Sequence, residues 1–226
     1  MKKAVCLLSG GMDSAVAAAI AKKQGYEIYA LSFDYGQRHK KELECARMIA
    51  CFLDVKEHRI LKIDLRGIGG SALTSCVDVP VGKDVSKIKE NKEIPITYVP
   101  ARNTIMLSFA LAYAEVAGAE AIYIGANCVD YSGYPDCRQE YFEKFQEMAD
   151  LATKRTVGGK MIRIETPIIK LDKAGIVRKG MELNVPFKDT WSCYLGGGKA
   201  CGRCDSCVLR LNGFIEAGVV DPIPYE

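Results

Sequence analysis

Residues 4–14 read AVCLLSGGMDS, an uncharged apolar run that passes directly into a glycine-containing turn. The apolar run, residues 4–8, is typical of a strand that is buried on both faces. The residues that follow, 12–23, are rich in alanine and predict a helix. A buried strand that enters a helix through a glycine turn indicates an α/β protein, because parallel sheets are built from such units.

Apolar runs and helical patterns continue to alternate along the chain. Further strands are predicted at 28–33, 59–63, 121–124 and 161–165, and further helices at 40–53, 104–117 and 139–153. We therefore expect a doubly wound α/β fold with a mainly parallel sheet, whose ligands bind outside the carboxyl ends of the strands. After residue 170 the pattern becomes helical and cysteine-rich. The sequence thus predicts an α/β domain over 1–170 and a small helical segment over 171–226.

The composition is that of a globular protein, with 49% hydrophobic and 26% charged residues among 226. It excludes disordered, collagen-like and low-complexity proteins. The net charge of +3 is too small to require a nucleic acid or a membrane as a partner. The first residues do not resemble a secretory signal, and the most apolar stretch is interrupted by Glu115 and Glu120, so we expect a cytoplasmic protein without membrane contact.

The turn after the first strand has the composition of a phosphate-binding loop. Gly10 and Gly11 let backbone N–H groups approach an anion, the start of the helix adds unpaired donors, and Ser9 and Ser14 offer hydroxyls. The loop matches neither the Walker A motif nor the dinucleotide fingerprint. Asp13 would repel a phosphate, so two interpretations stay open: it caps the helix, or it holds Mg²⁺ against the phosphates.

Three polar motifs stand where the carboxyl edge of the sheet is expected. They are FDYGQRH at 33–39, VPARN at 99–103 and GANCVDYSGYPDCR at 125–138. The third places carboxylates, an arginine and tyrosines in a Gly/Pro turn, which suits a flat heterocycle with hydrogen-bond donors on its edge; a plain solvated turn is the alternative. Residues 67–95 have no clear periodicity, and either a functional flap or a loosely held insertion accounts for them.

Four of the ten cysteines crowd into one stretch near the C-terminus, at Cys193, Cys201, Cys204 and Cys207. Four thiolates at this spacing, in a chain expected in the cytosol, favour a tetrahedral zinc site. An iron–sulfur cluster is the alternative, because Cys-x₂-Cys-x₂-Cys also occurs in ferredoxins, and unligated cysteines are a third. Four ligands leave no open coordination position, so the expected role of the metal is structural.

The motifs carry two resemblances. SGGMDS after a buried strand resembles the PP-loop, S-G-G-x-D-S, of the N-type ATP pyrophosphatase superfamily, and all five defined positions match. With FDYGQRH, VPARN, DYSGYPDCR and the four cysteines, residues 4–213 resemble the 7-cyano-7-deazaguanine synthase family. One position departs from the family pattern V-P-G-R-N: Ala101 stands in place of the glycine, and alanine does not readily adopt a positive φ.

The resemblance implies an ATP-dependent carbon–nitrogen ligase of queuosine and archaeosine precursor biosynthesis. It would adenylate the carboxylate of 7-carboxy-7-deazaguanine, let ammonia displace AMP, and activate the resulting amide a second time to form the nitrile. No glutaminase domain fits beside these motifs, so free ammonia is the expected nitrogen donor. The resemblance also implies Mg²⁺ with ATP, structural Zn²⁺, only small-molecule substrates without direct nucleic-acid contact, and a homodimer.

The resemblance assigns roles to residues of this chain. The catalytic residues would be Asp13, Arg102 and Lys173, although a lysine in a first helical turn is often merely solvated. ATP would be bound by Leu8, Ser9, Gly10, Gly11, Met12, Asp13, Ser14, Ala15 and Phe33. The acid would be bound by Asn103, Asp130, Ser132, Tyr134, Asp136 and Arg138. Either Asp130 or Asp136 would read the guanine-like edge, and Arg102 and Arg138 would neutralise the carboxylate.

Two other function classes stay open at this point. A PP-loop enzyme that thiolates tRNA would need a catalytic cysteine pair or a cluster, and a basic face for RNA, which the small net charge does not favour. A nucleic-acid-binding zinc module without enzymatic activity would leave both SGGMDS and DYSGYPDCR unexplained.

Overall fold

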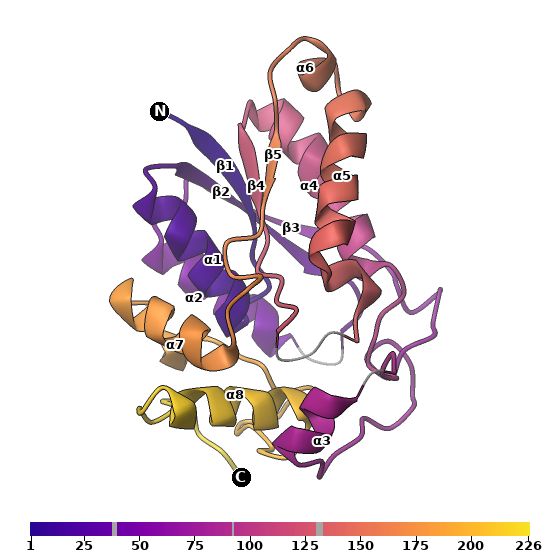
Figure 1. Cartoon of the computed structure of the whole chain (residues 1–226), viewed down its shortest axis with the longest axis vertical. Helices are drawn as coiled ribbons and strands as arrows, with labels where there is room; N and C mark the ends of the chain where they lie inside the picture. The colour runs from indigo at the N-terminus through magenta and orange to yellow at the C-terminus, as the bar shows by residue number, and fades with distance from the viewer. Residues whose placement is uncertain (38–39, 92, 130–132) are drawn as a thin grey trace.

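A computed structural model describes residues 1–37, 40–91, 93–129 and 133–226 of the chain. Five strands form one sheet, in the order β3-β2-β1-β4-β5. All four neighbouring pairs are parallel. The strands are β1 (Lys3–Leu7), β2 (Glu27–Asp34), β3 (Glu57–Lys62), β4 (Ala121–Tyr123) and β5 (Arg163–Glu165) (Figure 1). The predicted parallel sheet is confirmed.

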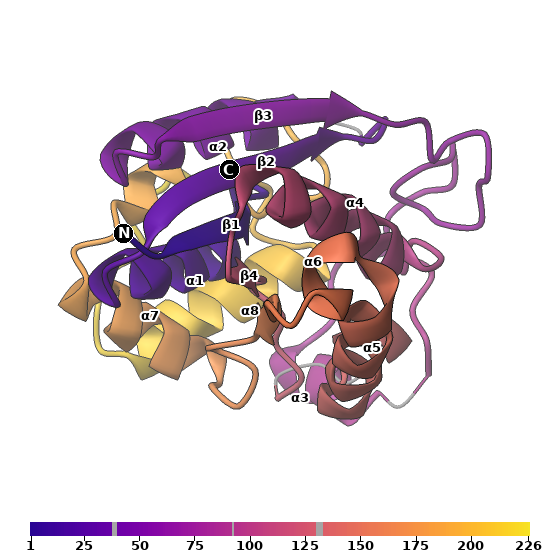
Figure 2. The ribbon, with the colours of Figure 1, turned by 90° about the horizontal axis from the view of Figure 1, so that it is seen from above.

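Helices cover both faces of the sheet, as the doubly wound prediction requires (Figures 1 and 2). One face packs against α1 (Met12–Lys23) and α2 (Lys41–Phe52); on the same side, α7 (Lys173–Glu182) packs against α1, and α8 (Asp205–Glu216) packs against α7. The other face packs against α4 (Arg102–Ala117) and α5 (Gln139–Ala152). Shorter elements are α3 (Val85–Glu90), α6 (Lys154–Val157), and the 3₁₀ turns η1 (Pro135–Cys137) and η2 (Phe187–Asp189).

The central strand, β1, explains why the opening sequence is uncharged. Val5 and Leu7 face the layer of α4 and α5, whereas Ala4 and Cys6 face the layer of α1 and α2, and all four are buried. The chain leaves β1 towards β2 and later returns on its other side as β4. The turn after β1 therefore lies at the point where the strand order reverses, which is where α/β proteins bind ligands.

Several elements differ in detail from the sequence prediction; β3, for example, spans Glu57–Lys62 instead of 59–63. Helix α4 begins at Arg102 instead of residue 104, because the Asp136 carboxylate accepts the backbone N–H of Asn103 (2.9 Å) and satisfies a donor of the first turn. Helix α6, Lys154–Val157, has no counterpart among the helices expected from the sequence; it starts with a capping box between Thr153 and Thr156. The last strand is shorter than expected, Arg163–Glu165.

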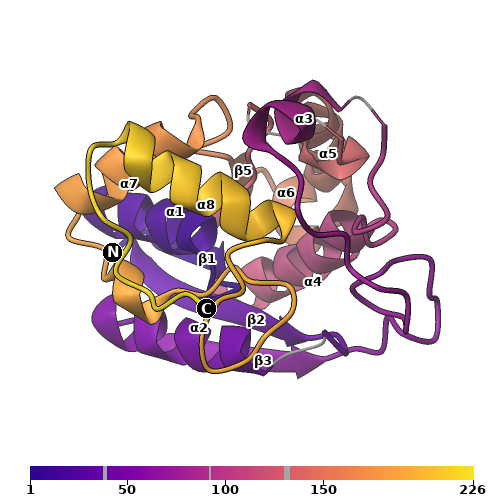
Figure 3. The ribbon, with the colours of Figure 1, turned by 90° about the horizontal axis from the view of Figure 1, so that it is seen from below.

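The described residues of the 67–95 segment, 67–91 and 93–95, are not a loosely held insertion. Helix α3 buries Ile88, and α3 lies beside α8 (Figure 3). Val81 forms a β-bridge with Cys204, and the Gly82 N–H donates to the Arg203 carbonyl (2.9 Å). The segment is thus held against the loop that carries the four cysteines, which we call the cysteine loop (residues 193–207).

The C-terminal residues are fixed by a buried ion pair. Arg210, only 1% exposed, donates to both carboxylate oxygens of Asp221, at 2.7 and 3.0 Å. Tyr225 donates to the same carboxylate (2.6 Å). Phe214 of α8 packs in the same core cluster as α1, so the sheet and the C-terminal helices share apolar contacts. The division at residue 170 stays a prediction. None of the described helices has the length and apolarity that crossing a bilayer requires.

Ala101 occupies a left-handed backbone conformation, with φ 50° and ψ 25°, directly before α4. An alanine costs roughly 1 kcal/mol there, because its Cβ crowds the backbone. We expect Ala101→Gly to raise the free energy of unfolding by about 0.5–1 kcal/mol, measured by urea denaturation. The matched control is Ala112→Gly on the exposed side of α4, which should lower stability by about 1 kcal/mol. Equal destabilisation by both changes would contradict this explanation.

Candidate active site

The turn after β1 is preorganised by its own hydroxyls. Ser9 Oγ donates to Ser14 Oγ (3.0 Å), and Ser14 Oγ donates to the Gly11 carbonyl (2.9 Å). Gly10 has φ 86°, and a Cβ there would lie 2.0 Å from the backbone oxygen of Glu42. Only glycine fits this contact, so the turn is pressed against the first turn of α2. Gly11, the N-cap residue of α1, supplies no side-chain cap, which leaves the first N–H groups of the helix for an anion.

Asp13 and Lys173 form an ion pair across the mouth of this turn. Lys173 Nζ lies 2.5 Å from Asp13 Oδ2, and the two side chains are only 15% and 27% exposed. Lys173 is the first residue of α7, whose start is fixed by the Asp172 carboxylate accepting the Gly175 N–H (2.7 Å). Lys173 is therefore not a solvated lysine. Asp13 makes no capping contact with α1, so the helix-cap interpretation has no support.

The second carboxylate oxygen of Asp13 is free for a ligand. Asp13 Oδ1 is buried and has no hydrogen-bond partner among the described residues. A buried oxygen without a partner is costly, and a carboxylate accepts only donors or cations. This oxygen fits a magnesium ion held beside phosphates.

A cleft with two lobes opens at the carboxyl edge of the sheet. The first lobe, about 260 Å³, is lined by the turn after β1 together with Phe33 and Tyr35 of the β2 end. The second, about 240 Å³, is lined by Thr97, Tyr134 and other residues from α3, α8 and the loop after β4. Asp13, Arg102 and Lys173, the three predicted catalytic residues, line both lobes and thus lie where the lobes meet.

The predicted ATP-binding residues gather around the first lobe. Those that line it are Leu8, Ser9, Gly11, Met12, Asp13, Ser14 and Phe33. Gly10 and Ala15 are not among its lining residues; Gly10 shapes the turn, and Ala15 is buried in the core beneath it.

Only some of the residues predicted to bind the acid line the second lobe. Asn103 and Tyr134 line the second lobe. The hydroxyl groups of Tyr134 and Thr97 form a hydrogen bond (3.0 Å). Asp130 and Ser132 lie outside the described residues. Asp136 and Arg138 are not among the lining residues of either lobe, and Arg138 is exposed at the start of α5.

Asp136 orients α4. Its Oδ2 accepts the Asn103 N–H (2.9 Å), and its backbone carbonyl accepts the Asn103 amide (3.0 Å). Burial raises the pKa of the Asp136 carboxyl, and the Asn103 N–H and the Arg102 charge act in the opposite direction. These contacts place Arg102 and Asn103 at the wall of the cleft.

Sequence reasoning missed several residues of the cleft. Glu42 of α2 lines the first lobe, and burial raises its pKa to about 7 even though the Arg102 charge lowers it. Tyr194 and Ser206, from the cysteine loop, line both lobes. The Trp191 N–H also donates to the Gly10 carbonyl of the phosphate turn (2.9 Å). The cysteines had suggested only metal binding, so no signal in the sequence pointed to this second role of the loop.

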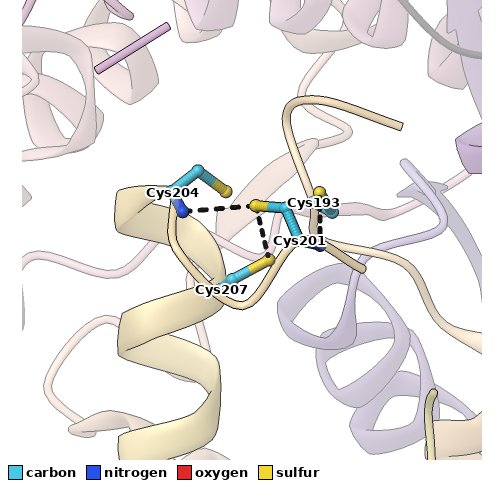
Figure 4. A group of neighbouring side chains, drawn as sticks. All are labelled: Cys193, Cys201, Cys204 and Cys207. Carbon is cyan, nitrogen blue, oxygen red and sulfur yellow. Dashed lines mark hydrogen bonds between the residues drawn. The ribbon is translucent and has the colours of Figure 1, made fainter. Parts of the chain in front are cut away.

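The four C-terminal cysteines form a compact buried cluster (Figure 4). Their sulfur atoms all lie within 4.8 Å of one another. The sulfur of Cys201 accepts the backbone N–H groups of Cys204 (3.3 Å) and Arg203 (3.4 Å), and Cys193 accepts the N–H of Cys201 (3.4 Å). The thiols of Cys204 and Cys207 lower the pKa of Cys193 by hydrogen bonding to its sulfur. Together the four cysteines could hold a metal ion.

The family model and the named relatives match nearly the whole chain. The family model described as "Queuosine biosynthesis protein QueC" matches residues 3–218. The 7-cyano-7-deazaguanine synthase of Syntrophus aciditrophicus is 59% identical over 224 residues, which cover 98% of this chain and 96% of the relative. The enzyme of the same name from Paramagnetospirillum magneticum is 56% identical over 227 residues, covering 100% and 99%.

Among solved structures, a 4-thiouridine synthetase–RNA complex with bound ATP aligns with 81% of this chain and 41% of its own, at a TM-score of 0.49 and 23% identity. The match of the family model and the identity to full-length relatives together establish the relationship. The chain belongs to the QueC family of queuosine biosynthesis proteins.

Proposed function

We propose that this chain is a 7-cyano-7-deazaguanine synthase, which uses ATP and ammonia to convert 7-carboxy-7-deazaguanine into the nitrile. The family and its named full-length relatives support this activity. The observation that carries the proposal in the structure is the two-lobed cleft, with the phosphate turn in one lobe and Asp13, Arg102 and Lys173 between the lobes. The alternatives of a tRNA thiolation enzyme and a nucleic-acid-binding module have no support from the family.

The first lobe is proposed to hold ATP, with its phosphates at the turn after β1. The free N–H groups of α1 and the hydroxyls of Ser9 and Ser14 would hold the phosphates, and Phe33 would contact the nucleoside. Mg²⁺, when bound at Asp13, would neutralise charge on the pyrophosphate as it leaves. Lys173 keeps Asp13 in place and adds a positive charge beside the phosphates.

The second lobe is proposed to hold the acid. Its carboxylate would lie at the junction of the lobes, where Arg102 can offer a guanidinium fork and orient an oxygen towards the α-phosphate of ATP. Adenylation converts this oxygen into a good leaving group, and ammonia displaces AMP to give the amide. In a second activation the amide oxygen attacks the α-phosphate of another ATP and pyrophosphate leaves; the oxygen then departs in AMP as the nitrogen loses its two protons, which gives the nitrile. Tyr134 and Asn103 line the acid's lobe; roles for Asp130, Ser132, Asp136 and Arg138 stay predictions.

The cysteine cluster is proposed to hold structural Zn²⁺. Four buried sulfur atoms within 4.8 Å of one another, stabilised by backbone N–H donors, suit a tetrahedral thiolate site with no open position. We further propose a cytoplasmic homodimer whose substrates are small molecules, without direct nucleic-acid contact.

The proposed activity is tested by incubating the protein with ATP, ¹⁵N-ammonium and 7-carboxy-7-deazaguanine, and analysing the products by mass spectrometry. We expect ¹⁵N-labelled 7-cyano-7-deazaguanine, together with AMP from the adenylation steps. ATP consumption without any labelled amide or nitrile would contradict the proposal.

A further inference from the structure

The wall of the second lobe that faces away from the sheet comes from two segments distant in sequence. Ile88 of α3 and Asp205, Ser206 and Leu209 of α8 line this wall. Figure 3 shows α3 beside α8, and the Val81–Cys204 bridge joins the two segments. Asp205 directly follows Cys204, one of the four cysteines proposed to hold zinc, so this metal would fix the position of its backbone.

Asp205 carries a buried oxygen without a partner. Among the residues that the structure describes, five buried side-chain nitrogen or oxygen atoms lack a hydrogen bond, and two of them are carboxylate oxygens: Asp13 Oδ1 and Asp205 Oδ1. Both residues line the second lobe. The other oxygen of Asp205, Oδ2, lies 3.6 Å from Lys83 Nζ of the 67–95 segment.

An ionised carboxylate accepts hydrogen bonds and donates none, so an unpartnered carboxylate oxygen at a ligand lobe calls for N–H donors or a cation on the ligand. The unpartnered oxygen of Asp13 is accounted for by the metal and phosphates of ATP. Asp205 does not line the nucleotide lobe and therefore needs its donor from the second ligand. The heterocycle of the proposed acid has such donors: a ring N–H next to an exocyclic amino group, spaced to meet the two oxygens of one carboxylate.

We propose that Asp205 reads the ring N–H and 2-amino edge of the deazaguanine, so that the metal-bound segment supplies the base specificity of the enzyme. The inference rests on the proposed function, since it names how that substrate is recognised. Asp136 is less suited to the task, because its Oδ2 already accepts the Asn103 N–H and the residue does not line the second lobe. The acid would then lie with its amino edge at α8 and its carboxylate at Arg102.

The test compares the binding of two ligands by calorimetry, using the full-length, zinc-loaded protein. One ligand is 7-carboxy-7-deazaguanine, and the other is the same acid without its 2-amino group. The unmodified protein is expected to bind the first at least about 10-fold more tightly, because an analogue without the amino group leaves a buried acceptor unpaired. In Asp205→Asn this preference should fall to about 3-fold or less, and ATP affinity should stay unchanged.

Glu216→Gln is the matched control, because it removes the same charge from the exposed far end of the same helix. It should retain the full preference. Zinc content and melting temperature report whether each variant is folded; should Asp205→Asn lose its metal, Asp205→Glu serves instead, since it keeps the charge but moves the oxygens.

Two results would overturn the inference alone: equal binding of both ligands by the unmodified protein, or an undiminished preference in the Asp205 variants, while the acid is still converted to the nitrile. A protein that does not convert the acid at all would overturn the proposed function and this inference with it.

Discussion

Asp13→Asn is expected to lower kcat for nitrile formation by roughly 10²- to 10³-fold while leaving the fold intact. The change is isosteric, but it removes the charge that pairs with Lys173 at 2.5 Å and the anionic oxygen available to a magnesium ion. An amide in that place binds a divalent cation more weakly and turns a donor towards Lys173. The measurement is the rate of nitrile formation at saturating ATP, ammonium and acid, with the melting curve recorded in parallel.

The control for this experiment is Asp54→Asn. Asp54 is almost fully exposed, lies 3.9 Å from Lys22 and is not among the lining residues of the cleft. Its substitution should leave both rate and melting temperature unchanged. If Asp13→Asn kept the rate of the unmodified protein, neither a metal nor a phosphate role for Asp13 would be tenable.

Removal of the metal is expected to loosen two parts of the chain together, the cysteine loop with α8 and the 67–95 segment. Structural zinc contributes about 10–16 kcal/mol of binding free energy in small peptides, which is as large as the whole stability of many domains. The two parts share the Gly82–Arg203 hydrogen bond and the Lys83–Asp205 ion pair. Limited proteolysis of the chelator-treated protein, with fragment masses, should therefore show new cleavage in both parts.

Elemental analysis of the untreated protein should find one zinc per chain, and the absence of iron would exclude the cluster alternative. Cys51→Ser, which changes an exposed cysteine on α2, should leave metal content and protease resistance unchanged. Full protease resistance in the metal-free protein would show that the metal has no structural role.

The fold could be predicted from the sequence because the patterns that indicate its strands and turns lie within short stretches of the chain. The buried run of β1 contacts apolar residues on both faces, so every residue from Ala4 to Leu7 had to be apolar. Gly10 marks a turn in which no residue with a Cβ would fit. The exact start of α4 was not accessible, because the carboxylate that caps it belongs to Asp136, 33 positions further along the chain. Nothing in a local pattern reports such a contact.

The site was only partly accessible for the same reason. The residues of the phosphate turn adjoin one another in sequence, and their motif is specific. The second lobe, in contrast, brings together Thr97, Asn103, Tyr134 and Asp205, whose proximity depends on how α3, α4 and α8 meet. Metal binding explained the cysteine motif fully, so there was no reason in the sequence to predict that the neighbouring residues Tyr194 and Ser206 line the cleft.

Hydrogen bonds connect the proposed metal site to segments that line both lobes of the cleft. Trp191, two residues before the loop, donates its backbone N–H to Gly10 of the phosphate turn, and Arg203 of the loop accepts the N–H of Gly82. Because linkage is reciprocal, a nucleotide that rigidifies the turn, or a base that orders the 67–95 segment, must tighten the binding of the proposed zinc by the same free energy with which zinc improves their binding. The affinity for zinc, measured by competition with a chromophoric chelator, therefore reports substrate binding without any turnover.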